Sequence, residues 1–476
     1  MRTTSIFGTA ISVINGISKA VSVCYYPRKL FKLTGLFATR KFPKAKNNHR
    51  YGILVAARNE DAVIGKLIES VNNQDYPREL IRIFVVAHNC TDNTAAAARQ
   101  AGAVCYEYND ESKKTKGYAL QYLVEQIRRD YGIDCCEGYF IFDADNLLKE
   151  DFITRMNESF DAGEKIVTSY RNTKNFDDNW ISASYGIHWL RTIRNEHRAR
   201  SAFRLATRIQ GTGFLFPWEV IKDGWKYTSL TEDRAFCADV VTLGYRISYN
   251  NDAEFFDEQP TDIKIAMRQR LRWSKGHLDA FVETGGKLFC NIFRTRGAAN
   301  KDEPDAPLWK KLLRNLRFRF INLDMLTVVF PRSITLSAKK ISVVLLKTLW
   351  TLTTAETLMQ TYGTGYLPDV IKWTLRLFGI YQVFPQTVLQ ALTLMSIFTF
   401  AWTVNTYFET ILNAAIVLIL EQRRLKRMKW YRQVWFCITF PIFDLIGKLT
   451  MLMALFIKVE WKPIPHKVAI GVDKVK

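Results

Sequence analysis

From residue 51 to about residue 285, short apolar runs typical of strands alternate with segments in which apolar residues recur at helical spacing. Three short apolar runs, Tyr51–Ala56, Ile81–Ala87 and Gly138–Phe142, have the length and composition of buried strands. Between them, Asp61–Gln74 and Lys116–Arg129 carry apolar residues at helical spacing. This order predicts a mostly parallel sheet covered by helices. Such sheets bind ligands beyond the carboxyl ends of their strands, so we expect functional residues there.

The pattern changes at about residue 307, where long apolar stretches replace the alternation. Leu308–Phe320 is basic and amphipathic, which predicts a helix lying on a membrane surface. The stretches 377–399 and 400–420 carry few charges and together are long enough for two spans of about 20 residues each. The carboxyl-terminal half of the chain is therefore predicted to be membrane-associated.

The last apolar stretch, Val434–Ile457, is interrupted by charges. Asp444 and Lys448 lie four residues apart, so they can pair on one face of a helix. Because charged residues inside a span are costly, we expect an interfacial or re-entrant helix here.

Basic residues flank the apolar segments. Thr4–Tyr26 is mostly apolar, and the basic segment Arg28–Arg50 follows it; a second basic cluster lies at Arg423–Arg432. The positive-inside rule places both basic segments in the cytoplasm. We expect four parts: a membrane-associated helix with a basic linker at 1–49, a catalytic domain at 50–290, interfacial and transmembrane helices at 305–458, and a cytoplasmic tail at 459–476.

The composition narrows the classes of partner. The 67 Lys and Arg residues outnumber the 46 Asp and Glu residues, so the formal net charge is +21. Nucleic acid, anionic lipid or a phosphorylated substrate would explain this charge. No zinc-finger spacing or RNA-binding signature accompanies it, so we expect a membrane protein and no nucleic-acid partner. The eight cysteines show no paired CxxC spacing, which predicts reduced thiols.

The first motif is Asp143-Ala-Asp145, directly after a predicted strand. Two carboxylates with one residue between them can share a divalent cation, which can neutralise a diphosphate leaving group. Alone, this pattern is usually a solvated turn. Its place at the carboxyl end of a strand favours the functional interpretation.

The second motif is Thr231-Glu232-Asp233, where a carboxylate can take the proton of an acceptor hydroxyl. The alternative is a helix start, with Thr231 as the cap and acidic residues in the first turn, and both can hold together.

The third motif is Gln269-Arg-Leu-Arg-Trp273. Its arginine can hold a pyrophosphate through paired hydrogen bonds, and its tryptophan offers a flat face on which a sugar can stack. The alternative is an ordinary basic amphipathic helix.

Together, the order and spacing of these motifs resemble the inverting, membrane-bound synthases of glycosyltransferase family 2, which include cellulose, chitin and hyaluronan synthases. The resemblance covers roughly residues 50–285 and implies a Rossmann-like, α/β GT-A catalytic domain in the cytoplasm, followed by transmembrane and interfacial helices. The segments that carry it are Ala57–Glu60, Gln74–Pro77, Asn89–Asp92, Lys116–Leu120, Asp143–Asp145, Thr231–Asp233 and Gln269–Trp273.

The resemblance implies how the donor would be bound. Glu60 and Lys116 would help to bind the nucleotide diphosphate. Asp143 and Asp145 would hold the nucleotide and a Mg²⁺ or Mn²⁺ ion, with Asp145 the closer metal ligand. The family usually has an acidic pair after the second strand, where this chain has Ala87 and His88. His88 would therefore contact the base in place of a carboxylate, which leaves uridine recognition open.

The resemblance also assigns the catalytic and acceptor residues. Asp233 would be the catalytic base, with Glu232 beside it. Arg272 would hold the diphosphate, and Gln269 and Trp273 would contact the acceptor.

Two further segments have open interpretations. Gly213 lies between two strand-like stretches, where a glycine would let the backbone approach the acceptor, or would simply form a turn. Trp461, Lys462 and His466 follow the last apolar segment and resemble, in placement, the gating loop of this family. Such a loop would close over the donor and exclude water; a plain tail is the alternative. The basic side chains of the helical stretch Trp189–Arg204 are expected to contact lipid headgroups.

These inferences predict a membrane-bound inverting glycosyltransferase that polymerises UDP-glucose or UDP-N-acetylglucosamine into a β-linked polysaccharide and secretes it. The alternative is a non-processive transferase that adds one sugar to a lipid acceptor. The expected partners are the nucleotide-sugar donor, the glycan acceptor and the lipid bilayer. The expected location is the plasma membrane, with several spans and a cytoplasmic catalytic domain. Donor sugar, linkage and accessory subunits are not readable from the pattern.

Overall fold

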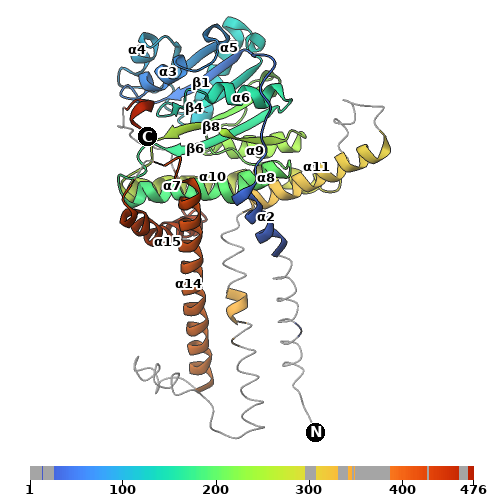
Figure 1. Cartoon of the computed structure of the whole chain (residues 1–476), viewed down its shortest axis with the longest axis vertical. Coiled ribbons are helices and arrows are strands. Elements are labelled where there is room, and N and C mark those ends of the chain that lie inside the picture. Colours follow the sequence, from blue (N-terminus) through green and yellow to red (C-terminus); the bar gives the residue numbers. More distant parts are fainter. Residues whose placement is uncertain are drawn as a thin grey trace. The chain divides into compact units, whose positions relative to one another are not determined.

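The computed structural model describes residues 13, 26–294, 307–330, 341–345, 348, 386–425, 428–459 and 470–475. The chain divides into two compact units. One comprises Met1–Phe31 and Ser333–Leu412, and the other comprises Lys32–Arg332 and Asn413–Lys476. The second unit contains the sheet and all the sites described below (Figure 1). The expected division into four parts stays a prediction.

A mixed sheet forms the centre of this second unit. Its strands run edge to edge in the order β3-β2-β1-β4-β7-β6-β8-β5. β1 pairs in parallel with β2 and β4, whereas β7 is antiparallel to both of its neighbours, β4 and β6. The strands are β1 Tyr51–Ala57, β2 Ile81–His88, β3 Val104–Tyr108, β4 Gly138–Asp143, β5 Leu147–Leu148, β6 Ile166–Thr173, β7 Phe214–Pro217 and β8 Ile247–Asp257.

Both faces of the sheet are buried. Along β1, Leu54 packs into one hydrophobic cluster while Ile53 and Val55 pack into another, as expected from the alternation of side chains along a strand. Residues of α5, α9 and α11 complete the first cluster, and residues of α3 and α6 complete the second. The helices are α2 Tyr26–Phe37, α3 Ile64–Asn72, α4 Thr94–Gln100, α5 Lys116–Tyr131, α6 Phe152–Asp161, α7 Trp180–Thr192, α8 Arg198–Ala202, α9 Glu232–Thr242, α10 Ile263–Asn291, α11 Leu308–Val329, α14 Gln386–Glu421 and α15 Trp430–Met453.

The expected α/β, GT-A-like fold is confirmed. β1, β2 and β4 lie where the apolar runs predict strands, and α3 and α5 lie where the helical spacing predicts helices. The parallel half of the sheet, β3-β2-β1-β4, contains the three predicted strands and in addition β3, which the sequence analysis did not predict. Its strands all end at the edge where the motif residues follow.

The pairing of β6 with β8 contains a bulge. Thr168 pairs with Tyr249 and Tyr170 pairs with Glu254, so the single residue Ser169 faces the four residues of the segment 250–253 in β8. Bulges of this kind bend a strand and redirect its side chains. The ladder closes again beyond the bulge and continues to Asp257 at the end of β8.

Two helices of the described chain are long and apolar enough to cross a membrane. They are Met395–Glu421 within α14, and α15 itself. The charges inside α15 are paired, because Asp444 lies 3.0 Å from Lys448 on the same helix and 2.9 Å from Arg191 of α7. The pairing expected from the four-residue spacing is therefore present. Whether α15 spans or lies at the interface stays a prediction.

The arginines of the basic stretch 189–204 differ from their expected role, because several of them point into the protein. Arg200 of α8 is 3% exposed and lies 2.8 Å from Asp324 of α11. Arg194 forms an ion pair with Glu421 at the end of α14. Charged side chains are buried only when they are paired, so these arginines hold remote segments together and do not contact lipid headgroups.

Candidate active site

One cavity collects the predicted motif residues at the carboxyl ends of β1, β2 and β4, the place where open α/β sheets bind ligands. Elements from distant parts of the chain supply them, including the ends of β2 and β4, the starts of α5 and α9, and the middle of α10. The structure brings these residues together, while their individual roles stay predictions. The predicted residues in its lining are Glu60, His88, Lys116, Asp143, Asp145, Glu232, Asp233, Gln269, Arg272 and Trp273.

Lys116 balances the charges of this cavity. Its Nζ forms an ion pair with Asp143, lies 3.8 Å from Oε1 of Glu232, and donates to the carbonyl oxygen of Gly211 at 3.1 Å. Burial acts to lower the pKa of Lys116, but the carboxylates of Asp143 and Glu232 outweigh burial and raise it. The lysine is therefore a fixed cation, as binding of a diphosphate requires.

Glu232 and Asp233 occupy the first turn of α9. Burial raises the pKa of Glu232 to about 7; Lys116 opposes this increase and Asp233 adds to it. Near neutral pH, the carboxyl group of Glu232 therefore exists in both its protonated and its ionised form.

The start of α9 is positioned by packing. Thr231 stands at the N-cap position, but its side chain makes no capping hydrogen bond. Thr231 packs instead against Gly276 of α10, where an added Cβ would lie 2.4 Å from Oγ1 of Thr231. A glycine is needed at position 276 for this close approach, and the approach fixes the position of Glu232 and Asp233.

Asp145 lies beside a second carboxylate, Asp257 at the end of β8. Oδ2 of Asp145 accepts the backbone N–H of Glu258 at 2.8 Å, and Nε of Arg171 donates to Oδ2 of Asp257 at 2.7 Å. Burial raises the pKa of Asp257 to about 6, opposed by Arg171 and assisted by Asp145. The two carboxylates are thus crowded, and added positive charge would relieve the crowding.

The donor set fits a divalent cation that is shared with a substrate. Among the residues that the structure describes, no group of three or more His, Cys, Asp and Glu side chains has the arrangement of a complete metal site. Asp143 and Asp145 supply two carboxylates, and Mg²⁺ at such sites takes its other ligands from phosphates and water. These residues would therefore hold Mg²⁺ or Mn²⁺ together with a bound diphosphate.

The third motif divides between two faces of α10. Gln269, Arg272 and Trp273 line the cavity, as their spacing of three and four residues on one helical face allows. Arg270 points toward α15, where its guanidinium lies 4.0 Å from the ring of Phe443. α10 thus separates the cavity from α15 and presents different residues of one motif to each.

An aromatic wall surrounds Trp273. Its ring lies 5.5 Å from that of Trp189 and 5.9 Å, edge-on, from that of Tyr185, both of α7. The guanidinium of Arg171 lies over the ring of Trp189, 4.1 Å from the ring centre. Flat apolar faces beside polar groups are suited to bind a sugar.

His88, for which the resemblance implies contact with the base, lines the cavity. Its ring stacks on Tyr108 with 5.3 Å between centroids. Burial lowers the pKa of His88, and the charge of Arg58 lowers it further, so the imidazole is neutral. A neutral imidazole has one donor and one acceptor nitrogen for a base.

One predicted residue lies outside the lining of the cavity, and three others lie outside the described residues. Gly213 lies outside the lining, whereas Gly211 lies in it. Gly213 has φ +67°, and a Cβ there would lie 2.3 Å from the ring of Phe255, so packing explains this glycine. The gating-loop residues Trp461, Lys462 and His466 lie outside the described residues.

The cavity also contains residues that the sequence did not reveal. They are Arg58, Arg171, Trp189, Arg208, Arg234 and Asp257. Arg58 stands inside the first matching segment and could have been found there. Arg234 directly follows the second motif and could have been found with it. The others stand in segments with no recognisable motif, and only the fold brings them to the cavity.

Parts of the chain are similar to known proteins. Residues 49–276 match the model of the family described as "Glycosyltransferase like family 2". The chain is 24% identical over 273 residues to "Probable glycosyltransferase YdaM" of Bacillus subtilis, an alignment that covers 50% of this chain and 58% of the relative. It is 37% identical over 265 residues to "Beta-monoglucosyldiacylglycerol synthase" of Synechocystis sp., covering 53% of this chain and 51% of the relative. The chain thus spans between half and three fifths of these relatives' length.

A solved structure is also similar. It is described as mannosyltransferase PcManGT from Pyrobaculum calidifontis in complex with GDP-Man and Mn²⁺. The TM-score is 0.41 at 16% identity, and the alignment covers 83% of this chain and 98% of that chain.

Proposed function

Residues 49–276 are like the glycosyltransferases of family 2, and from this premise we propose that the chain transfers a hexose from a nucleoside-diphosphate sugar to a lipid acceptor. The observation that carries the proposal is the single cavity in which Lys116, Asp143 and Asp145 meet Asp233 and Arg272. The lipid acceptor is favoured by the 37% identity to a relative whose name describes glucosylation of diacylglycerol. The two apolar helices of the described chain are consistent with such an acceptor.

The proposed reaction is one displacement at the anomeric carbon. Asp233 accepts the proton of the acceptor hydroxyl, and the oxygen of that hydroxyl forms a bond to the anomeric carbon of the donor. The bond from this carbon to the diphosphate oxygen breaks, and the diphosphate leaves with both electrons. One displacement inverts the anomeric configuration, so an α-linked donor gives a β-linked product.

Cations of the chain receive the charge of the leaving group. Lys116 is fixed between Asp143 and Glu232, and Arg272 lines the same cavity. Positive groups aimed at developing negative charge lower the barrier because they need no rearrangement during the reaction. A divalent cation held by Asp143 and Asp145 would supply further positive charge at the diphosphate.

A second candidate function is the polymerisation of a β-linked polysaccharide. The observation that favours it is the third motif, whose residues Gln269, Arg272 and Trp273 face the cavity together. The aromatic wall of Trp273 and Trp189 would then hold the end of a growing glycan. Polymer synthesis requires the acceptor to be a sugar chain, and lipid glucosylation requires it to be a diacylglycerol.

The experiment that separates these functions is an analysis of product size. The full chain is purified in detergent and given radiolabelled UDP-glucose, UDP-N-acetylglucosamine or GDP-mannose with diacylglycerol and Mg²⁺. One labelled glycolipid that dissolves in chloroform supports the lipid acceptor. A ladder or an insoluble polymer supports the polysaccharide synthase. If no donor is consumed with any acceptor and metal, the chain is no glycosyltransferase.

A further inference from the structure

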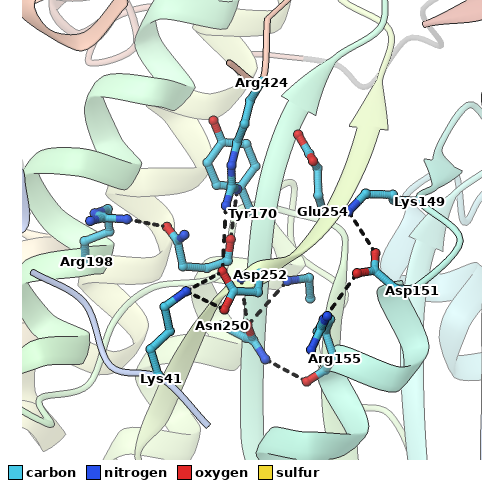
Figure 2. A network of polar contacts seen from close by, with 12 residues as sticks. Lys41, Lys149, Asp151, Arg155, Tyr170, Arg198, Asn250, Asp252, Glu254 and Arg424 are labelled. Carbon is cyan, nitrogen blue, oxygen red and sulfur yellow. Dashed lines mark hydrogen bonds and ion pairs between the residues drawn. The ribbon is translucent and has the colours of Figure 1, made fainter. Parts of the chain in front are cut away.

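A second cavity lies in the same unit and shares no residue with the first. Its walls come from the linker before β1, the turn between β5 and α6, α6 itself, β8, and the two residues Arg423 and Arg424 after α14. Figure 2 shows the lining residues other than Arg423. Five basic and three acidic side chains line it, a formal excess of 5 − 3 = 2 positive charges. An excess of cations in a hollow raises the local concentration of anions.

Each of two aspartates in this cavity holds a pair of cations. Asp252, in the bulge of β8, lies 2.7 Å from Lys41 and 3.8 Å from Arg424. The second aspartate, Asp151, holds Lys149 at 3.1 Å and the guanidinium of a residue of α6, Arg155, at 3.2 Å. Four cations therefore stand close together around two carboxylates (Figure 2).

The third acidic side chain of this cavity, Glu254, is buried and already hydrogen-bonded within the protein. Its Oε1 accepts a hydrogen bond from Nδ2 of Asn172 at 2.8 Å, and its backbone oxygen accepts the N–H of Lys149 at 3.1 Å. Glu254 is 5% exposed, so it offers little surface to a ligand. The accessible groups of the cavity are thus mainly cationic.

Arg424, just beyond the end of α14, is held in place by contacts within the protein. The guanidinium of Arg424 lies 4.1 Å from the ring centre of Tyr170, and its Nη1 donates to the backbone oxygen of Asn251 at 2.9 Å (Figure 2). Nδ2 of Asn172 donates to the backbone oxygen of Arg424 at 2.9 Å. A site whose groups are already ordered loses less entropy when it binds.

Arg423 is the fifth basic residue in the lining of this cavity. It is exposed and forms no ion pair within the described part of the chain. It stands two residues after Glu421, the last residue of the candidate span Met395–Glu421. A cation just beyond the end of a span lies at the depth of lipid headgroups.

We propose that this second cavity binds a phosphate group, the one in the headgroup of an anionic phospholipid at the end of the candidate span. Arg423 and Lys149 supply the accessible charge, and Lys41 and Arg424, held by Asp252, form the opposite wall. The proposal is independent of sugar transfer, because the two cavities have no lining residue in common.

The test measures binding without activity. The full chain in a neutral detergent is titrated with dioctanoyl phosphatidic acid, and its melting temperature is followed at each concentration. The test variant carries Arg423→Gln with Lys149→Gln. The matched control is Lys429→Gln, which removes one charge from the same basic segment but outside the cavity. We expect the test variant to need an about tenfold higher lipid concentration than the unsubstituted chain, and the control to behave as the unsubstituted chain.

A parallel titration with inorganic phosphate identifies the source of the phosphate. Stabilisation by the lipid alone supports the headgroup. Equal stabilisation by inorganic phosphate at the same concentration overturns the lipid source and leaves a soluble anion. Equal responses of all three proteins to the lipid, or no response of the unsubstituted chain to either ligand, would overturn the site. If the double variant fails to fold, Arg423→Gln alone serves, since it breaks no ion pair in the described chain.

Discussion

At the scale of single residues, two neighbouring carboxyl groups have different surroundings in the first turn of α9. Glu232 lies 3.8 Å from Lys116, which binds it from the donor side. Asp233 is its neighbour in sequence and lines the same cavity. Because the lysine draws Glu232 toward the donor, we assign proton transfer to Asp233.

Asp233→Asn is expected to lower the rate of transfer about 10²–10⁴-fold, the range typical of a lost general base. Donor binding should change little, because the proposed reaction assigns the diphosphate of the donor to Lys116, Asp143 and Arg272. Transfer is measured with labelled donor, and donor affinity by calorimetry. Asp223→Asn, at an exposed position outside the cavity, is the control and should keep full activity. Normal turnover by the Asp233 variant would refute the assignment.

Glu232→Gln is expected to change how stability depends on pH. Burial raises the pKa of Glu232 from 4.5 to about 7. A carboxyl group whose pKa is raised by folding contributes stability that is fully present below about pH 4.5 and is lost as the pH rises through about 7. The free energy of unfolding of the unsubstituted chain should therefore fall relative to that of the variant across this window.

Denaturant titrations of both proteins without divalent cations, between about pH 5 and pH 8, measure this difference. Parallel pH dependences of the two unfolding free energies would show that Glu232 has an ordinary pKa in the folded chain.

At the scale of elements, the contact between α9 and α10 is set by one glycine. Gly276→Ala would place a methyl group 2.4 Å from Oγ1 of Thr231, so the start of α9 would have to move away from α10. We expect transfer to fall at least about tenfold, because small displacements of catalytic groups are costly. Melting temperature and turnover are measured together.

The control for this variant is Gly286→Ala on the same helix, where an added Cβ meets nothing within 4 Å. It should keep full activity and stabilise the helix by about 0.5–1 kcal/mol, since alanine is the better helix former. Equal activities of the two variants would show that the close contact does not position α9.

Three strands of the first half of the sheet were predictable, and the strands of the second half were not. β1, β2 and β4 are apolar on both faces, so each appears as a local run in the sequence. β6 and β8 contain buried polar residues such as Asn172 and Asn250, which pair with partners about 80 to 90 residues away. Their burial depends on those partners, and a local pattern does not reveal it.

The candidate site follows the same division. The motif residues were predictable because each motif stands directly after a strand or in a regular helix. Arg171 and Trp189 were missed, because they reach the cavity only through the pairing of β6 and the packing of α7. The arginines around Arg200 were misassigned, because the partner Asp324 lies 124 residues further along the chain.

At the scale of the whole molecule, the end of α14 is bound into the unit that contains the sheet. Glu421 is 2% exposed; its Oε2 accepts the hydroxyl of Tyr170 at 2.9 Å, and its other oxygen pairs with Arg194. Tyr170→Phe removes one partner of this buried carboxylate and should lower the free energy of unfolding by about 1–3 kcal/mol. Denaturant titration of the full chain in detergent measures the change.

Tyr131→Phe is the control for this prediction. Tyr131 is 41% exposed at the end of α5, so loss of its hydroxyl should change the free energy of unfolding by less than about 0.5 kcal/mol. If both variants are equally stable, the hydrogen bond to Glu421 contributes nothing measurable to the stability of the unit that contains the sheet.

The bulge of β8 has a consequence for how this protein can be altered. The four residues 250–253 of β8 lie opposite the single residue Ser169 of β6, and regular pairing resumes on both sides of them. Asp252 of this segment lines the second cavity, whereas Asp257, where the ladder ends, lines the first. One strand therefore contributes a carboxylate to each cavity, so a change in the length of this segment would act on both.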